Sequence, residues 1–149
     1  MTLSRDAIAR LVPHHGAMCL LEEVLEWDAG AIACRAVSHR DPANPLRAAG
    51  ALPAVAGIEY AGQAVAVHGA LITQGQKPRI GYLAALRNVV CRVERLDTQP
   101  GDLVVRATQV AAESRRLLYD FRVESGGSEL LKGRLSVVLV SDPGAGHGR

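Results

Sequence analysis

The chain has 149 residues, 48% of them hydrophobic, which is enough apolar material for one folded domain with a buried core. Its formal charge is only +2, and its 17 basic and 15 acidic residues are mixed along the chain. Without a basic block, and with only one Trp, three Tyr and one Phe, the composition argues against a nucleic-acid partner.

The three cysteines, Cys19, Cys34 and Cys91, lie far apart and form no CxxC pair. Their spacing argues against a disulfide framework and against a zinc site, so we predict reduced thiols and no metal. Residues 1–10 carry charges where a signal peptide needs an apolar core. Both features favour a cytoplasmic protein.

The first elements in chain order are a short helix and two strands. Ser4 is a suitable N-cap for a helix over Arg5–Leu11. Cys19–Trp27 and Ala31–Val37 are strand-like runs separated by Asp-Ala-Gly, which is typical of a hairpin turn. Residues 38–52 are rich in turn-forming residues and are predicted to be a loop.

A long helix is predicted from Pro53 to Gln74. Pro53 suits the first helical position, and no further proline occurs before Pro78. The helix is apolar or small on every side, which indicates that protein covers it all round. The weakly polar stretch from Ala48 to Thr73 is also long enough for a membrane span, but Glu59 near the middle of that stretch argues against one.

The chain after Pro78 is predicted to form an antiparallel meander. The strand-like segments in this part are Ile80–Leu96, Leu103–Ala112, Leu117–Glu124 and Glu129–Val140. The order of elements predicts an α+β fold in which a curved antiparallel sheet wraps around the long helix. We expect one domain over residues 1–140 and a disordered tail over residues 141–149.

PAVAGIEYAGQ, residues 53–63, resembles the central helix of hotdog-fold 3-hydroxyacyl-acyl-carrier-protein dehydratases. In that family a Pro-Gly pair opens the helix, an acid follows six positions after the Pro, and a Gln lies four beyond. Pro53, Glu59 and Gln63 have these offsets, and Ala54 stands where the family has Gly.

Two further segments are similar to the same family in the same order: LVPHHGAMCLLEEVLEWDAG, residues 11–30, and GYLAALRNVVCRVERLDTQPGDLV, residues 81–104. Gly-Ile-Glu-Tyr, followed by His-Gly-Ala-Leu at residues 68–71, most resembles the branch found in aryl-polyene biosynthesis clusters.

The resemblance implies a hotdog fold and a dehydratase that converts 3-hydroxyacyl thioesters on an acyl carrier protein to enoyl thioesters. It implies no metal and no redox cofactor. The N–H groups at the helix start, together with the helix dipole, would bind and polarise the thioester carbonyl. The implied substrate-binding residues are Pro53, Ala54, Ala56 and Gly57.

Glu59 is the main catalytic candidate. Burial in an apolar helix would raise the pKa of its carboxyl, and a protonated carboxyl can donate to a leaving hydroxyl. Glu59 would instead be ordinary if it lay at an exposed edge or paired with an arginine. Gln63, one turn further on, could orient Glu59 or bind the same water, and a structural contact is an equal alternative.

The family's catalytic His is missing at its usual offset. It stands fourteen residues before the acid, where this chain has Pro45, and the only His in the loop is His39, twenty residues before Glu59. Either His39 acts as the base or the chain lacks one. His39 is expected to be an exposed loop residue, with catalysis as the alternative role. His14 matches a structural His of the family, and His68 is expected to be a satisfied interior or interface residue.

A helix that is apolar all round predicts a dimer in which the two long helices lie close together. A homodimer would hold two acids and no base unless His39 supplies it. A heterodimer with a related hotdog subunit that carries the His would complete a site. Two other functions stay open: a hotdog thioesterase in which the acid activates water, and a non-catalytic acyl-binding subunit that completes a partner's site.

Overall fold

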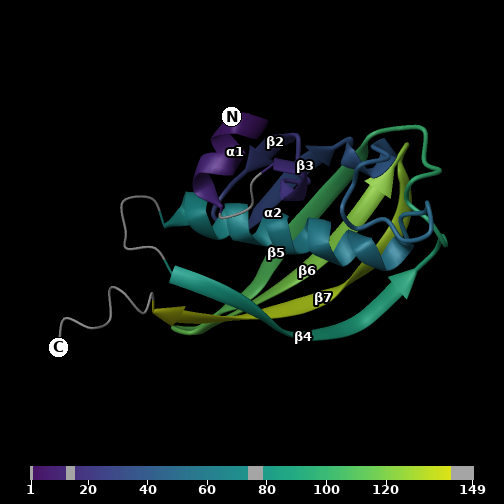
Figure 1. Ribbon diagram of the computed structural model, residues 1–149. Helices are drawn as coiled ribbons and strands as arrows, with labels where there is room; N and C mark the ends of the chain where they lie inside the picture. The colour runs from purple at the N-terminus through teal and green to yellow at the C-terminus, as the bar shows by residue number, and fades with distance from the viewer. Residues whose placement is uncertain (1, 13–15, 74–78, 142–149) are drawn as a thin grey trace.

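The computed structural model describes residues 2–12, 16–73 and 79–141 as one curved antiparallel sheet around a long helix (Figure 1). The strand order is β1-β2-β3-β5-β6-β7-β4. The strands are β1 (Leu3–Ser4), β2 (Glu23–Trp27), β3 (Ala31–Ala36), β4 (Arg79–Cys91), β5 (Leu103–Ala112), β6 (Arg116–Ser125) and β7 (Ser128–Ser141). The helices are α1 (Arg5–Leu11) and α2 (Gly57–Ile72), with short 3-10 turns η1 (Gly16–Met18), η2 (Ser38–Arg40) and η3 (Ala54–Ala56).

The first helix and hairpin follow the local signals in the sequence. The Ser4 hydroxyl accepts the Ala7 N–H at 3.3 Å, which caps α1 as predicted. In the β2–β3 turn, the Asp28 carboxylate accepts the Gly30 N–H at 2.8 Å. The predicted first strand is shortened to Glu23–Trp27, because the N–H and the C=O of Leu20 bond to the side chains of Gln63 and Ser38 and not to a neighbouring strand.

The long helix is the centre of the fold, and its side toward the sheet is buried. η3 forms its first turn after Pro53, and α2 then runs to Ile72. The buried residues of α2 are Gly57, Tyr60, Ala61, Gln63, Ala64, Val65, Val67, His68 and Leu71. Although residues 54–72 are long and apolar enough for a membrane span, 56% of that stretch is buried in the protein, as expected for a core helix.

Strands β5, β6 and β7 form an antiparallel meander as predicted, with core-facing and outward-facing side chains alternating along β5 and β6. The prediction is wrong for β4, which does not pair with β5 but lies beside β7 at the edge of the sheet. The predicted strand 80–96 is interrupted: β4 ends at Cys91, and Arg95 then forms an isolated bridge with Pro53. β4 is an edge strand, and every residue from 81 to 88 is exposed. Of the tail expected to be disordered, residues 142–149 lie outside the described part of the chain.

Candidate active site

One face of the long helix formed by η3 and α2 is left uncovered by its own chain, and we call it the open face. It comprises Val55, Glu59, Gly62 and Ala66, whose spacing of four, three and four places them on one side of the helix. Val55 is 58% exposed, and Glu59 and Ala66 are also exposed. Small residues and solvent, rather than the sheet, surround this side.

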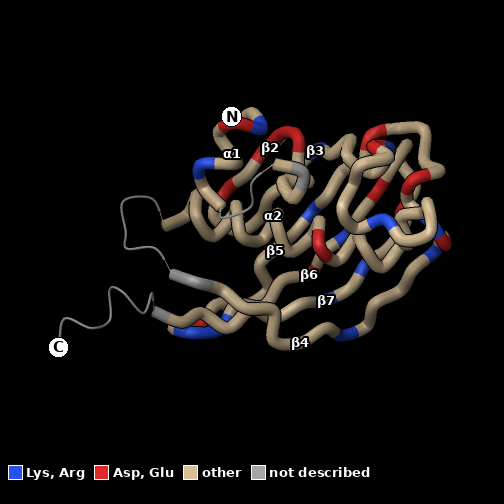
Figure 2. The backbone as a smooth tube through the Cα atoms, in the orientation of Figure 1, with Lys and Arg blue, Asp and Glu red and all other residues tan. Residues whose placement is uncertain are grey.

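The expected burial of Glu59 is therefore wrong for the single chain, because Glu59 lies on the side of α2 that the sheet does not reach. No other residue of α2 carries a charge, and Figure 2 shows the rest of the helix free of Lys, Arg, Asp and Glu. Glu59 is nevertheless a lone carboxyl on an apolar surface. A second protein chain packed against this surface would exclude water from it.

The N–H groups at the helix start are mostly occupied. Ala54 donates to a carbonyl of the segment after β4 at 3.0 Å, and Ala56 donates to Pro53 O at 3.0 Å. Gly57 donates to two carbonyls of the preceding 3-10 turn, and Pro53 has no N–H. Within the described chain, Val55 N–H has no hydrogen-bond partner. The residue that offers a free donor is thus Val55, which the motif comparison did not single out.

Val55 and Glu59 lie one helical turn apart on the open face. The site therefore presents a free N–H donor at the positive end of a helix and a carboxyl one turn further on. An N–H in this position can bind a carbonyl oxygen that gains negative charge, and a carboxyl can donate or accept a proton nearby. Together they could bind the carbonyl oxygen of an acyl thioester and exchange a proton with its acyl chain.

Gln63 points away from the open face into the protein. It is 2% exposed, its Oε1 accepts the Leu20 N–H at 2.9 Å, and its Nε2 donates to Met18 O at 2.6 Å. The four-residue spacing from Glu59 leaves the two side chains about 40° apart around the helix, enough to bury one and expose the other. In the single chain, the Gln63 amide anchors the segment before β2.

His39 is buried rather than exposed in a loop, contrary to the sequence-based expectation. Its Nε2 lies 3.1 Å from Gln99 O and 3.0 Å from Gly101 O, so this nitrogen carries the proton and donates. Burial lowers the pKa of His39, and within the described residues its Nδ1 has no hydrogen-bond partner. The ring ties the loop before α2 to the Pro-Gly-Asp turn and does not reach the open face.

His68 is a satisfied interior residue, as expected. Its Nε2 donates to Asp28 O at 2.8 Å, and its Nδ1 accepts from the Tyr119 hydroxyl at 2.6 Å. Burial lowers the pKa of this imidazole. His14 and His15 lie outside the described residues. Within the described chain, no imidazole stands beside Glu59.

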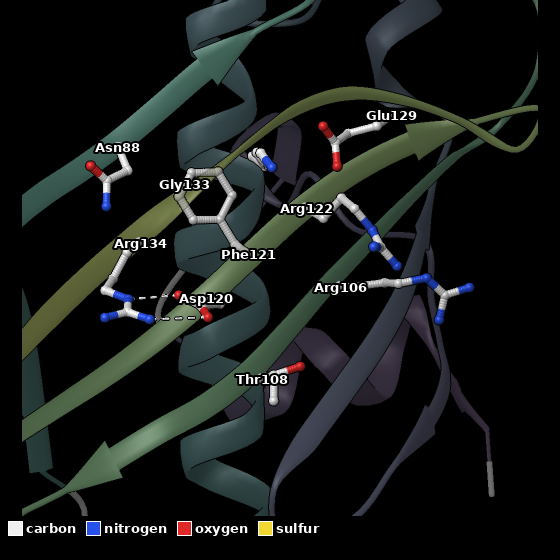
Figure 3. A pocket seen from close by; sticks show the side chains of 10 residues that line it. Asn88, Arg106, Thr108, Asp120, Phe121, Arg122, Glu129, Gly133 and Arg134 are labelled. Atoms are coloured by element: carbon white, nitrogen blue, oxygen red, sulfur yellow. Dashed lines mark hydrogen bonds and ion pairs between the residues drawn. The ribbon is translucent and has the colours of Figure 1, made fainter.

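A groove of about 400 Å³ on the outer face of the sheet is a different surface. Figure 3 shows it with α2 behind the strands, so the sheet separates it from the open face. The three arginines that line it are each paired with a carboxylate: Arg134 donates to Asp120 at 2.7 Å, and Arg106 and Arg122 donate to Glu124, next to the groove, at 3.0 Å and 2.6 Å. We therefore place the candidate site on α2.

The fold occurs in solved structures of two activities. A chain of "The Dehydratase Heterocomplex ApeI:P from Xenorhabdus doucetiae" matches with a TM-score of 0.81 and 24% identity, over 91% of each chain. A thioesterase from Haemophilus influenzae matches with a TM-score of 0.67 and 13% identity, over 95% of this chain and 93% of the other. These likenesses confirm the predicted hotdog fold.

Sequence comparison identifies the family. No curated protein sequence matches the chain significantly. The ApeP-like family model, described as ApeP dehydratase, matches residues 6–145. This match covers nearly the whole chain and confirms the resemblance seen in the helix motif. The chain belongs to the ApeP-like dehydratase family.

Proposed function

We propose that this dehydratase chain is the acid-bearing subunit of a two-chain enzyme that acts on 3-hydroxyacyl groups carried on an acyl carrier protein. The observation that carries the proposal is the open face, where Val55, whose N–H is unpaired within the described chain, and Glu59 lie one helical turn apart without a described imidazole. The resemblance to the aryl-polyene branch supports a cytoplasmic pathway of that kind as the source of the substrate.

The reaction divides between the two chains. A base removes the proton from C2, and the developing charge moves onto the thioester oxygen, which Val55 N–H stabilises. The C3–O bond then breaks as the C2–C3 double bond forms, and the hydroxyl leaves as water with a proton from the Glu59 carboxyl. Proton exchange through solvent restores the base and the acid.

The base comes from the partner in this proposal. His39 holds two backbone carbonyls through Nε2, and His68 is engaged at both nitrogens, so neither is free to reach a substrate on the open face. A neutral His of a second hotdog subunit would suit the task, because its pKa lies near working pH. The dehydratase heterocomplex from Xenorhabdus doucetiae, which this chain resembles, supports an assembly with a different chain.

The partner would also complete the environment of Glu59. β4 exposes Leu83 (52%) and Leu86 (39%), which pair with Val137 and Leu135 and so point to the α2 side of the sheet. A second hotdog chain laid against these residues and the open face would exclude water from Glu59. Removal from water favours the neutral carboxylic acid, which is the form that donates a proton to the leaving hydroxyl.

The test is turnover of a 3-hydroxyacyl thioester by the chain alone and with a His-bearing hotdog subunit, following enoyl product and free thiol separately. We expect slow or no reaction alone and enoyl product with the partner. Robust turnover alone would remove the need for a partner, and its loss in His39→Ala would make His39 the base. Free thiol without enoyl product would support a thioesterase instead.

A further inference from the structure

The start of the long helix is held in place from outside the helix. No side chain caps it. Instead, residues 52–54 pair with residues 94–97 after β4: Leu96 N–H donates to Leu52 O at 2.8 Å, and Ala54 N–H donates to Glu94 O at 3.0 Å. The last contact of this set comes from a side chain, because the Asp97 carboxylate accepts the Leu52 N–H at 2.9 Å.

Asp97 is an almost fully covered carboxylate, with its side chain only 7% exposed. Its oxygens accept from Arg95 Nε at 3.1 Å and Arg95 Nη2 at 2.5 Å, and Arg47 Nη1 lies 3.8 Å away. The hydrogen bond from Arg95, followed by that from Leu52 N–H, holds the pKa of Asp97 far below its usual range. The carboxylate therefore stays charged and fixed at all working pH values.

Arg47 extends this arrangement into the loop that leads to the helix. Its side chain is 16% exposed, and it donates to Asp41 O at 2.9 Å, to Gly50 O at 3.0 Å and to His39 O at 3.2 Å. The planar guanidinium thus fixes three carbonyls of one loop and faces Asp97 at the same time. Asp97 and Arg47 together bind the loop, the helix start and the segment after β4 into one rigid unit.

We propose that Asp97 is a positioning residue for the dehydration site, setting the place of Val55 N–H and, one turn on, of Glu59. The inference rests on the proposed function. Among the described residues, the Asp97 carboxylate contacts Leu52 N–H, its own backbone N–H and the two arginines, so it acts through the backbone and not on the substrate. Leu52 is three residues before Val55, so a shift at Leu52 moves the donor directly.

The test compares Asp97→Asn with Asp120→Asn in the complete enzyme, at a temperature where both variants are folded by circular dichroism. Asn keeps an oxygen for Leu52 N–H but loses the charge that orders the arginines. Because small misplacements of a catalytic group can cost up to about 10²-fold, we expect kcat to fall at least about tenfold in Asp97→Asn, with KM changed less than about twofold. Asp120 pairs with Arg134 on the outer face, and its variant should leave both constants unchanged.

A second readout does not depend on turnover. The amide chemical shift of Val55 and the hydrogen-exchange rate of Ala54 should change in Asp97→Asn and stay unchanged in Asp120→Asn. If Asp97→Asn fails to fold, Arg95→Gln replaces it, since the Arg95 side chain is 47% exposed, and it should move the same readouts in the same direction.

Unchanged kcat and an unchanged Val55 amide in the folded Asp97 or Arg95 variant would overturn the proposal and leave Asp97 a role in stability alone. Should the wild-type enzyme show no dehydration, the proposed function fails, but the two amide signals still decide whether Asp97 positions the helix start.

Discussion

At the scale of single residues, the exposure of Glu59 and of His39 is the opposite of what their sequence neighbours suggest. Glu59 lies in an apolar helix but faces outward, whereas His39 lies in a polar loop but is fully buried. Glu59 is exposed because the sheet covers the opposite side of α2. His39 is buried because its loop folds back onto the turn that contains Gly101. Exposure here is a tertiary property.

Replacing Glu59 tests its catalytic role. Glu59→Gln keeps the size and the hydrogen-bonding ends of an exposed side chain, so the thermal midpoint should stay within about 2 °C of wild type. It removes the proton that the leaving hydroxyl needs, so kcat of the complete enzyme should fall about 10²–10⁴-fold. Dehydration at a near-normal rate by Glu59→Gln would rule out this assignment.

The buried imidazoles make stability depend on pH. Burial lowers the pKa of His39 and of His68 below the ordinary value of 6.5, so the unfolded chain binds their protons more readily. Their contribution to stability is therefore complete above pH 6.5 and is lost as pH falls below it. The free energy of unfolding in urea should be lower at pH 5.5 than at pH 7.5.

The control for this pH effect is His68→Gln, which removes one titrating group. Around His68 stand the Tyr119 hydroxyl from β6 and Asp28 from the β2–β3 turn, whose carboxylate acts in the opposite direction by raising the pKa. The loss of stability between pH 7.5 and pH 5.5 should be smaller in the variant. An equal loss in both proteins would show that His68 does not contribute to it.

At the scale of elements, close approach between α2 and β7 depends on Gly57. A methyl group at Gly57 would lie 2.6 Å from Leu131 Cδ2 and 2.9 Å from Leu131 Cδ1, which is closer than side chains normally pack. Gly57→Ala should therefore lower the free energy of unfolding by about 1–3 kcal/mol, the usual cost of overpacking a core.

Chemical denaturation of a double-mutant cycle checks the contact between these two elements. Leu131→Val removes the δ-methyl groups that the new methyl would meet, so the cost of Gly57→Ala should shrink in that background. Equal costs in both backgrounds would mean that the helix start moves as a whole. In that case the strain would lie in the 3-10 turn and not at β7.

At the scale of the whole molecule, a single chain exposes a large apolar surface, which indicates that a second chain covers it. The open face of α2 is uncovered, and so is the edge strand β4, where Tyr82, Leu83, Leu86 and Val90 are 59%, 52%, 39% and 40% exposed. A long apolar edge strand is a pairing site for another chain. We therefore expect the chain to form a homodimer, or a heterodimer with the His-bearing subunit, and not to be a stable monomer in solution.

Sedimentation at micromolar concentration measures this assembly directly. A dimer should be present with the partner subunit, and Leu83→Lys with Leu86→Lys should weaken it, because two charges would replace buried apolar contacts. Arg122→Lys, on the outer face of the sheet, is the matched control and should leave the dimer intact. A monomer that persists in the presence of the partner would contradict the prediction.

The sequence by itself determined the elements whose signals are local. The Ser4 cap, the Asp-Ala-Gly turn, the Pro53 helix start and the alternating strands all depend on neighbours a few residues away. The motif offsets also point to Glu59 as the proposed acid, because a helix keeps a fixed period and a family keeps its spacing along it.

Only the tertiary structure decided which groups are free to act. Within the described chain Val55 N–H stays unpaired, and the carbonyl three residues before it, Leu52 O, accepts instead from Leu96 N–H. His39 is held by carbonyls about sixty residues away. Sequence spacing does not encode which distant carbonyl a donor meets, since that depends on how the sheet curves around α2. The same curvature covers one side of the helix and leaves Glu59 for a second chain to cover.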